Sequence, residues 1–280
     1  MIVARTVADL RAVLRERSGS IGLVPTMGAL HEGHATLLRS ARKTDDTVVM
    51  TIFVNPAQFN EPSDLAAYPR TEEADLALAA SEGVDVVFAP DAGEVYPAGF
   101  ATTVSVTGPL AETLEGAERG RAHFDGVATV VTKLLLAALP DHAYFGAKDA
   151  QQVAVIRRFV ADLGIPVTIV VCPTSRDTDG LARSSRNIRL SPEERAQALA
   201  IPHALQEVTD AAASGIADTE ALRARALATL EASGIHPEYV AFVDPITFAP
   251  VTAVARPVLV AIAARVGRTR LIDNTVLGGA

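Results

Sequence analysis

Two histidines stand three residues apart in the stretch VPTMGALHEGH, residues 24–34, directly after an apolar run. If a helix begins here, His31 and His34 share one face, and both imidazoles could donate hydrogen bonds to phosphate oxygens. Gly28 and Gly33 would let the backbone approach such a ligand closely, with the N–H groups and positive dipole end of the new helix pointing at it. One alternative is that one histidine caps the turn and the other is incidental. A zinc site fails because the spacing is not i, i+4 and no third ligand is evident.

A second stretch, YFGAKDAQQ at 144–152, repeats this arrangement of an apolar run, a glycine and a charged turn. Asp149 stands where a helix N-cap would lie, and Lys148 could reach a phosphate as a point charge. Gln151 and Gln152 fall in the first turn of the expected helix, where an amide could bind a polar substrate. The alternatives are a solvent-exposed lysine beside a cap and amides that face water.

Two further stretches carry neutral and basic donors. ARSSRNIR, residues 182–189, places Ser184, Ser185 and three arginines in an expected loop, where they could wrap a triphosphate. A basic loop paired with acidic surface residues is equally compatible with that pattern. In FVNPAQFN, Asn55 and Gln58 are neutral donors suited to hydroxyls and carboxylates, although Asn-Pro also opens ordinary turns. Together, the donor clusters predict a nucleotide site.

Alternating strand and helix patterns must position these residues. Apolar runs predict strands at 21–26, 47–54, 84–89, 142–146 and 167–172, and a period of 3.6 predicts helices at 33–44, 71–83, 126–139 and 149–164. Such alternation implies an α/β fold with a parallel sheet that is covered on both faces. Ligands of these sheets bind beyond the carboxyl ends of the strands, where the strand order reverses.

Residues 173–192 lack apolar periodicity, which predicts a long, functional loop between two bodies. After this loop, the patterns predict helices at 191–214 and 217–233 and strands at 238–244 and 257–266. The predicted domains are therefore residues 1–173 and a smaller α+β domain at residues 174–280.

Composition limits the classes of function. The chain of 280 residues has a formal net charge of −8, so no overall positive field attracts nucleic acid. An anionic ligand then needs a local basic cluster or a divalent cation. The single cysteine, Cys172, is expected to be a small buried hydrophobe. No stretch reaches the roughly 18 apolar residues of a membrane span, and the N-terminus is unlike a signal peptide, which predicts a cytoplasmic protein without a membrane partner.

The stretches VPTMGALHEGH, IFVNPAQF, YFGAKDAQQ and DGLARSSRN resemble, in order and separation, the signature blocks of the pantoate–β-alanine ligase family, and the similarity spans essentially the whole chain. The resemblance implies a Rossmann-like sheet of the nucleotidyltransferase type, a C-terminal lid domain and a homodimer. It implies that pantoate condenses with β-alanine through a pantoyl-adenylate, with ATP as substrate, Mg²⁺ as cofactor, and AMP and pyrophosphate as products.

The resemblance also implies roles for individual residues. His34 would donate a proton with His31 as its partner, and Lys148 and Arg186 would contact the phosphates. Gln58 would contact pantoate and β-alanine, and Gln152 would contact pantoate, whereas metal ligands are not assigned. The residues expected at ATP are Met27, Gly28, Ala29, Leu30, His31, Glu32, Gly33, His34, Gly146, Ala147, Lys148, Asp149, Ser175, Arg183, Ser184, Ser185 and Arg186.

Two positions and one segment depart from the family pattern. Arg183 replaces an uncharged residue and Ala147 replaces a common glutamate. The segment EGAERGRAHF, residues 115–124, is one residue longer than its counterpart, so His123 aligns but either Arg119 or Arg121 could take the place of the family arginine.

Three alternative functions stay open at this point. A nucleotidylyltransferase with a phosphorylated acceptor is disfavoured, because Arg or Lys would suit that acceptor better than Gln58 and Gln152. A ligase for another acid or amine, and a nucleotide-binding sensor without catalysis, both remain compatible with the sequence.

Overall fold

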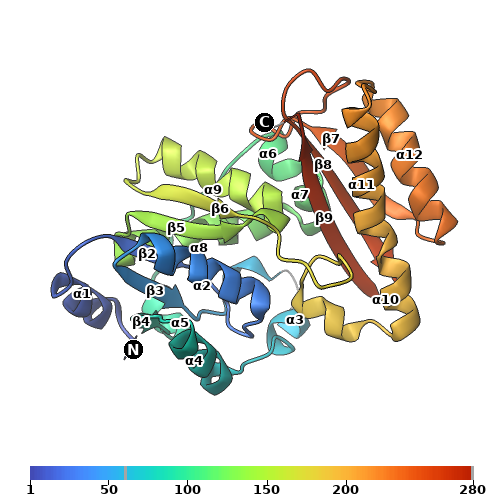
Figure 1. The fold of residues 1–280 in the computed structure, drawn as a ribbon. Coiled ribbons are helices and arrows are strands. Elements are labelled where there is room, and N and C mark those ends of the chain that lie inside the picture. The colour runs from blue at the N-terminus through green and yellow to red at the C-terminus, as the bar shows by residue number, and fades with distance from the viewer. Residues whose placement is uncertain (60–61, 279–280) are drawn as a thin grey trace. The chain divides into compact units, whose positions relative to one another are not determined.

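The computed structural model describes residues 1–59 and 62–278, and its chain forms two compact units (Figure 1). The first unit comprises Met1–Ala147 and Val155–Pro173, and the second comprises Lys148–Ala154 and Thr174–Ala280. Contacts thus group the short segment Lys148–Ala154 with the second unit. The predicted boundary after residue 173 stays a prediction.

The first unit contains a six-stranded, all-parallel sheet, which confirms the predicted α/β class. Its spatial order is β1-β4-β3-β2-β5-β6, so the order reverses between β2 and β5. The carboxyl ends of these two strands therefore flank the position where ligands of such sheets bind. The strands are β1 (Ile2–Ala4), β2 (Ile21–Val24), β3 (Thr47–Thr51), β4 (Val86–Phe88), β5 (His142–Gly146) and β6 (Thr168–Cys172).

Both faces of this sheet are buried, as a parallel sheet requires. Val48 and Met50 of β3 share a core with Leu38 and with the predicted buried thiol, Cys172, whereas Val49 points to the opposite face and is also fully buried. The helices along this part of the chain are α1 (Val7–Arg15), α2 (Glu32–Thr44), α3 (Pro62–Ala66), α4 (Glu72–Ser81), α5 (Ala92–Val95), α6 (Pro109–Glu112), α7 (Glu115–Arg119), α8 (Arg121–Ala138) and α9 (Ala150–Asp162).

Two helix boundaries differ from the prediction for identifiable reasons. The helix predicted at 126–139 begins at Arg121, because Gly120, with φ of 76°, separates it from α7. The helix predicted at 191–214 is two helices, α10 (Pro192–Ala198) and α11 (Ala200–Ala213), which meet at Leu199. Pro202 lacks an N–H and crowds the carbonyl four residues earlier, which breaks a continuous helix there.

The second unit packs helices on an antiparallel sheet of three strands, β7 (Pro237–Val243), β8 (Val258–Val266) and β9 (Thr269–Leu277). Alternate residues Val258, Val260 and Ile262 of β8 join the helices α11 and α12 (Thr219–Ala232) in one core. This arrangement confirms the smaller α+β part of the fold. The patterns do not predict β9, because charged and polar residues interrupt its apolar alternation.

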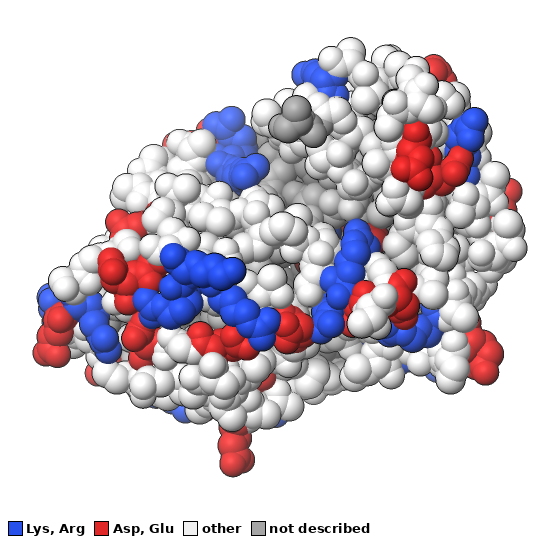
Figure 2. Space-filling view, in the orientation of Figure 1, with Lys and Arg blue, Asp and Glu red and all other residues white. Residues whose placement is uncertain are grey.

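Acidic and basic side chains lie next to one another over α2 (Figure 2). Arg39 pairs with Glu32 and Glu82, and Arg42 pairs with Asp85 at 2.7 Å. Both arginines of α2 are thus matched by carboxylates. Within the described residues, every helix is too short or too polar to cross a membrane.

A buried carboxylate, Asp45, ties the end of α2 to the sheet. It accepts a hydrogen bond from the hydroxyl of Tyr144 at 2.6 Å, and it lies 2.7 Å from Nδ1 of His142. Gly22 leaves room for this carboxylate, since a Cβ at that position would lie 2.3 Å from its Oδ2. Burial, reinforced by the bond to Asp45, raises the pKa of Tyr144 to about 12.

Substituting Tyr144→Phe should lower the free energy of unfolding by about 1–3 kcal/mol, because Asp45 loses a buried donor. The unfolded phenol loses its proton near pH 10, whereas the folded phenol keeps it until about 12. This contribution is therefore complete below about pH 10 and disappears as the pH rises toward 12. Denaturant unfolding of the parent protein and of Tyr144→Phe, at neutral pH and at about pH 11, measures this difference in the free energy of unfolding. If both proteins lose the same stability between the two pH values, the prediction is wrong.

Candidate active site

The two histidines of the first stretch form the cap of α2. His31 is the N-cap residue, and its Nδ1 accepts a hydrogen bond from the backbone N–H of Gly33 at 3.1 Å. In return, the backbone N–H of His31 donates to Nδ1 of His34 at 3.3 Å. The two ring centroids are 4.2 Å apart. The alternative that one ring caps and the other is incidental is wrong, because both rings take part in the capping box.

This cap determines where the imidazole protons lie. A neutral imidazole accepts at one nitrogen and donates at the other. Because Nδ1 accepts in both His31 and His34, each ring carries its proton on Nε2. Two N–H donors thus belong to neighbouring rings at the positive end of a helix dipole, an environment that favours anions.

The turn that precedes α2 already holds a carboxylate. The backbone N–H groups of Ala29 and Leu30 donate to Asp75 of α4 at 2.9 and 2.7 Å, and that of Gly28 donates to the hydroxyl of Thr26. Asp75 is 2% exposed. The backbone N–H groups of this turn are therefore engaged by protein oxygens. An anion at this helix would depend on the imidazoles and the dipole.

Gln58 lies at the end of the short 3-10 helix η1 (Pro56–Gln58), shortly after β3. Its amide nitrogen donates to Sδ of Met27 at 3.1 Å, and its amide oxygen accepts from Asn55 at 3.0 Å. The bond to Met27 joins the stretches that follow the neighbouring strands β2 and β3. Two predicted site residues thus meet at the carboxyl edge of the sheet.

Asn55 is the centre of a buried scaffold behind Gln58. Its Oδ1 accepts hydrogen bonds from the backbone of Ala57 at 3.2 Å and from the hydroxyl of Tyr96 at 2.7 Å. Its Nδ2 donates to the carbonyl of Gly126 at 3.1 Å. Burial raises the pKa of Tyr96 to about 12, so its phenol remains a donor at neutral pH. The predicted turn role of Asn55 is confirmed, and Tyr96 is a partner that no motif indicated.

Helix α8 packs directly against η1. A Cβ on Gly126 would lie 2.3 Å from the carbonyl oxygen of Ala57, so this close approach requires glycine. His123 is buried, and its Nδ1 lies 2.9 Å from the carbonyl oxygen of Gln58. Because a carbonyl only accepts, this ring carries a proton on Nδ1. His123 therefore holds the backbone of Gln58 from a buried position in α8.

The two candidate arginines of EGAERGRAHF lie on different helices. Arg119 ends α7 and pairs with Glu115 at 3.1 Å. Arg121 begins α8, donates to the hydroxyl of Ser105 at 3.1 Å and lies 3.7 Å from the carboxylate of Asp125. Both arginines have protein partners, and which of them takes the place of the family arginine stays open.

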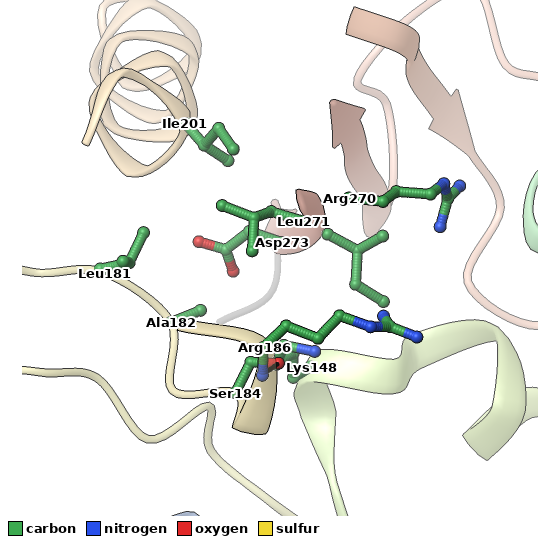
Figure 3. Close-up of a pocket in the computed structure, with 10 residues that line it drawn as sticks. Lys148, Leu181, Ala182, Ser184, Arg186, Ile201, Arg270, Leu271 and Asp273 are labelled. Atoms are coloured by element: carbon green, nitrogen blue, oxygen red, sulfur yellow. Dashed lines mark hydrogen bonds between the residues drawn. The ribbon is translucent and has the colours of Figure 1, made fainter. Parts of the chain in front are cut away.

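Three predicted phosphate ligands line one narrow pocket of the second unit. Figure 3 shows Lys148, Ser184 and Arg186 on one side of this pocket. Lys148 belongs to the 3-10 turn η2 (Ala147–Asp149), and Arg186 belongs to η3 (Ser185–Arg189). The hydroxyl of Ser184 accepts from the backbone N–H of Arg186 at 3.2 Å and so caps η3. Residues far apart in the sequence therefore form one cationic group.

Other predicted residues are placed differently. Arg183 turns toward its own loop, where its Nε lies 3.1 Å from both the carboxylate of Asp177 and the carbonyl of Arg176. Its backbone N–H donates to the carbonyl of Ser175 at 2.9 Å. The Arg183 guanidinium thus matches the surface-pairing alternative. Ser185 is exposed.

Gly146 ends β5 beside the point where the strand order reverses. Its φ lies outside the left-handed region, and within the described residues no atom beyond its chain neighbours lies within 4 Å of where a Cβ would be. Neither its backbone nor its packing therefore requires glycine, which leaves room for a ligand. Shortly afterwards, Gln151 is 5% exposed and Gln152 is half-buried in the first turn of α9.

Comparisons with known proteins find one family along the whole chain. The profile of the family described as "Pantoate-beta-alanine ligase" matches residues 2–276. A "Pantothenate synthetase" of Roseiflexus castenholzii is 50% identical over 278 residues, with 99% of each chain covered. The crystal structure of pantothenate synthetase from Thermus thermophilus has a TM-score of 0.92 and 45% identity, covering 98% of this chain and 99% of that one. A pantoate-beta-alanine ligase from Francisella tularensis, "Complexed with Beta-gamma ATP and Beta-alanine", has a TM-score of 0.80 and 34% identity, covering 99% and 97%.

Substituting Asp75→Ala should release the turn before α2. Ala29 and Leu30 would keep part-buried N–H groups without an acceptor, so we expect the free energy of unfolding to fall by about 2–3 kcal/mol. Glu73→Ala, at an exposed position of the same helix, is the control and should change it by less than about 0.5 kcal/mol. Urea denaturation measures both. Equal effects of the two substitutions would show that Asp75 does not hold the turn.

Proposed function

The chain belongs to the pantoate-beta-alanine ligase family, and from this membership and the geometry of its site we propose that it condenses pantoate with β-alanine, using ATP. A carboxylate oxygen of pantoate attacks the α-phosphorus, and the bond from that phosphorus to pyrophosphate breaks. The amine of β-alanine then attacks the acyl carbon of the pantoyl-adenylate, AMP departs and the nitrogen loses a proton. The observation that carries this proposal is the capped histidine pair, which sits where the strand order reverses.

His31 and His34 would act through the protons on their Nε2 atoms. Charge on the phosphoryl oxygens must be stabilised while the transferred group passes between two oxygens in line. Donors held in place by the cap need no reorganisation to do this, which is the condition for effective electrostatic catalysis. His34 is the proposed proton donor and His31 its partner. No covalent bond to the protein is needed.

Lys148 and Arg186 would supply positive charge to the phosphates. Both line the same pocket, and Ser184 fixes the backbone from which Arg186 projects. The rest of the proposed ATP contacts, besides His31 and His34, are Met27, Gly28, Ala29, Leu30, Glu32, Gly33, Gly146, Ala147, Asp149, Ser175, Arg183 and Ser185. Because Arg183 is engaged by Asp177, its contribution would come from its backbone rather than from its charge.

Gln58 and Gln152 are the proposed ligands of the organic substrates. A neutral amide can donate to a carboxylate and accept from a hydroxyl or an amine. The amide of Gln58 is oriented by Met27 and Asn55, so its contact with pantoate and β-alanine would be preorganised. Gln152 would contact pantoate.

The proposal includes Mg²⁺ beside the nucleotide. Among the residues that the structure describes, no three His, Cys, Asp or Glu side chains form a group that could hold a metal ion. Mg²⁺ in nucleotide sites is commonly held by phosphate oxygens, water and one or two carboxylates. Asp149, half exposed beside Lys148, fits this pattern and would hold the ion. When bound, Mg²⁺ neutralises phosphate charge.

A homodimer in the cytoplasm completes the proposal. Leu136 and Leu139 near the end of α8 are 47% and 61% exposed, and their side chains would suit burial against a second copy. Cys172 is free and buried, which is compatible with a reducing compartment where ATP is available.

The substrate requirement tests this function directly. With ATP and Mg²⁺, pantoate alone should release at most one equivalent of pyrophosphate per site, because the adenylate has no amine to attack it. Adding β-alanine should give continuous release, with AMP and pantothenate formed in equal amounts. No release with pantoate would favour a sensor, and turnover only with another acid or amine would favour a different ligase. A panel of acids and amines in the same pyrophosphate assay measures this.

The substitution His34→Gln separates catalysis from capping. Glutamine is a natural third residue of a capping box, so its amide oxygen can still accept from the backbone of His31. Losing the imidazole proton should lower the rate of adenylate formation by at least about 100-fold, while the melting temperature stays within a few degrees. Single-turnover pyrophosphate release and thermal denaturation measure the two effects. An unchanged rate would remove His34 from the mechanism.

A further inference from the structure

An ion pair between an exposed arginine and a buried carboxylate fastens the long loop of the second unit to β9. Arg176 donates from both terminal nitrogens to the carboxylate of Asp273, at 2.7 and 3.0 Å, and also to the carbonyl of Gly180. Asp273 is 3% exposed. A two-point contact of this kind fixes the orientation of the guanidinium as well as its distance. Loss of Arg176 would be costly, because the carboxylate of Asp273 would stay buried without its partner.

The pair holds a small hairpin that leads into the phosphate-binding residues. Arg176 and Ala182 form an antiparallel bridge, and Asp177 donates from its backbone to Leu181 at 2.9 Å. Figure 3 shows Asp273 reaching from β9 toward Leu181 and Ala182, on one side of the pocket lined by Lys148, Ser184 and Arg186. Ser184 follows the hairpin after one residue. The position of the η3 cap therefore depends on the hairpin.

The next residue of β9 holds the other phosphate-binding segment. The side-chain amide of Asn274 donates to the backbone carbonyl of Lys148 at 2.8 Å. This bond fixes the peptide group that follows Lys148 and so restricts the direction in which its side chain leaves η2. Asp273 and Asn274 are also linked to each other, because a carboxylate oxygen of Asp273 accepts from the backbone of Asn274 at 2.8 Å.

We propose that Asp273 and Asn274 are positioning residues for ATP: Asp273 acts through Arg176 on the segment with Ser184 and Arg186, and Asn274 acts on Lys148. This inference rests on the proposed function for the identity of the ligand. One strand thereby sets the spacing between two groups of phosphate donors, although neither of its residues needs to touch the nucleotide.

Charge supports this assignment. A buried carboxylate beside a phosphate site would repel its ligand unless it were matched. Arg176 matches Asp273, and Arg270 in the same pocket is matched by Glu238 at 2.6 Å. Lys148 and Arg186 add two further cationic side chains to the lining of the same pocket. Asp273 thus serves as an anchor without cancelling the positive charge that phosphate needs.

One substitution tests the role of Asp273, and a second tests the role of Asn274. In Asp273→Asn, the loss of a charged, two-point contact should raise the KM for ATP about tenfold or more. In Asn274→Ala, the loss of one hydrogen bond should raise it about threefold to tenfold. The KM values for pantoate and β-alanine should change by less than about twofold, since both residues act on phosphate donors alone. Equilibrium binding of a non-hydrolysable ATP analogue provides the same comparison without turnover.

Asp244→Asn is the matched control. Asp244 is also buried in the second unit and pairs with Arg256 at 2.9 Å, but it does not line the described pocket. It should lower the melting temperature comparably and leave the KM for ATP unchanged. If all three substitutions lower stability and change every KM alike, the role is structural and the proposal is overturned. An unchanged KM for ATP in folded Asp273→Asn and Asn274→Ala also overturns it.

Proteolysis distinguishes this proposal from the proposed function. Trypsin cleaves after arginines, and Arg183, Arg186 and Arg189 lie in the anchored segment. Cleavage there should accelerate several-fold in Asp273→Asn and stay unchanged in Asn274→Ala, which holds a different segment. If the parent protein releases no pyrophosphate, the function fails, but this difference still reports whether β9 holds the loop. Equal cleavage of parent and Asp273→Asn overturns the anchor.

Discussion

Two neighbouring imidazoles can present protons to an anion only if their other nitrogens are satisfied, and in this protein the start of α2 satisfies them. The backbone of Gly33 and of His31 donates to the two Nδ1 atoms, so the helix that is capped also orients the groups that cap it. Asp75 completes the arrangement by holding the preceding turn. Protein atoms thereby engage the backbone N–H groups of Ala29, Leu30 and Gly33.

The region around Gln58 differs from the histidine pair, because it is built from neutral amide and phenol groups that are closely packed. Asn55 accepts hydrogen bonds from η1 and from Tyr96, and it donates one to α8. Gly126 has no side chain, which lets α8 approach η1 closely. The high pKa of Tyr96 keeps its phenol uncharged around neutral pH, and the amide groups carry no charge. Such a scaffold suits substrates that are recognised through hydroxyl and carboxylate groups, whereas the cations are grouped in the second unit around Lys148 and Arg186.

Periodic apolar patterns predict five strands of the parallel sheet and the histidine-bearing helix, because buried strands and amphipathic helices leave regular spacing. The same approach misses β9, since Arg270, Asp273 and Asn274 break the apolar alternation. Arg270 and Asp273 line a pocket. It also misses Asp75 and Tyr96, whose partners lie 46 and 41 residues away and leave no local signal. Candidate site residues can be predicted where they stand close together in one sequence motif. They cannot be predicted where their partners are distant in the sequence and meet only in the folded chain.

Gly146 differs from the glycines that packing dictates. A Cβ at Gly22 or at Gly126 would lie 2.3 Å from a protein atom, whereas the space beside Gly146 is open. The φ of Gly146 lies outside the left-handed region. Folding therefore places no steric demand on the side chain at this position. If ATP binds here as proposed, a methyl group in place of the Gly146 hydrogen would obstruct the nucleotide while the fold stays intact. Gly146 is thus a position at which nucleotide selectivity could be changed without repacking the protein.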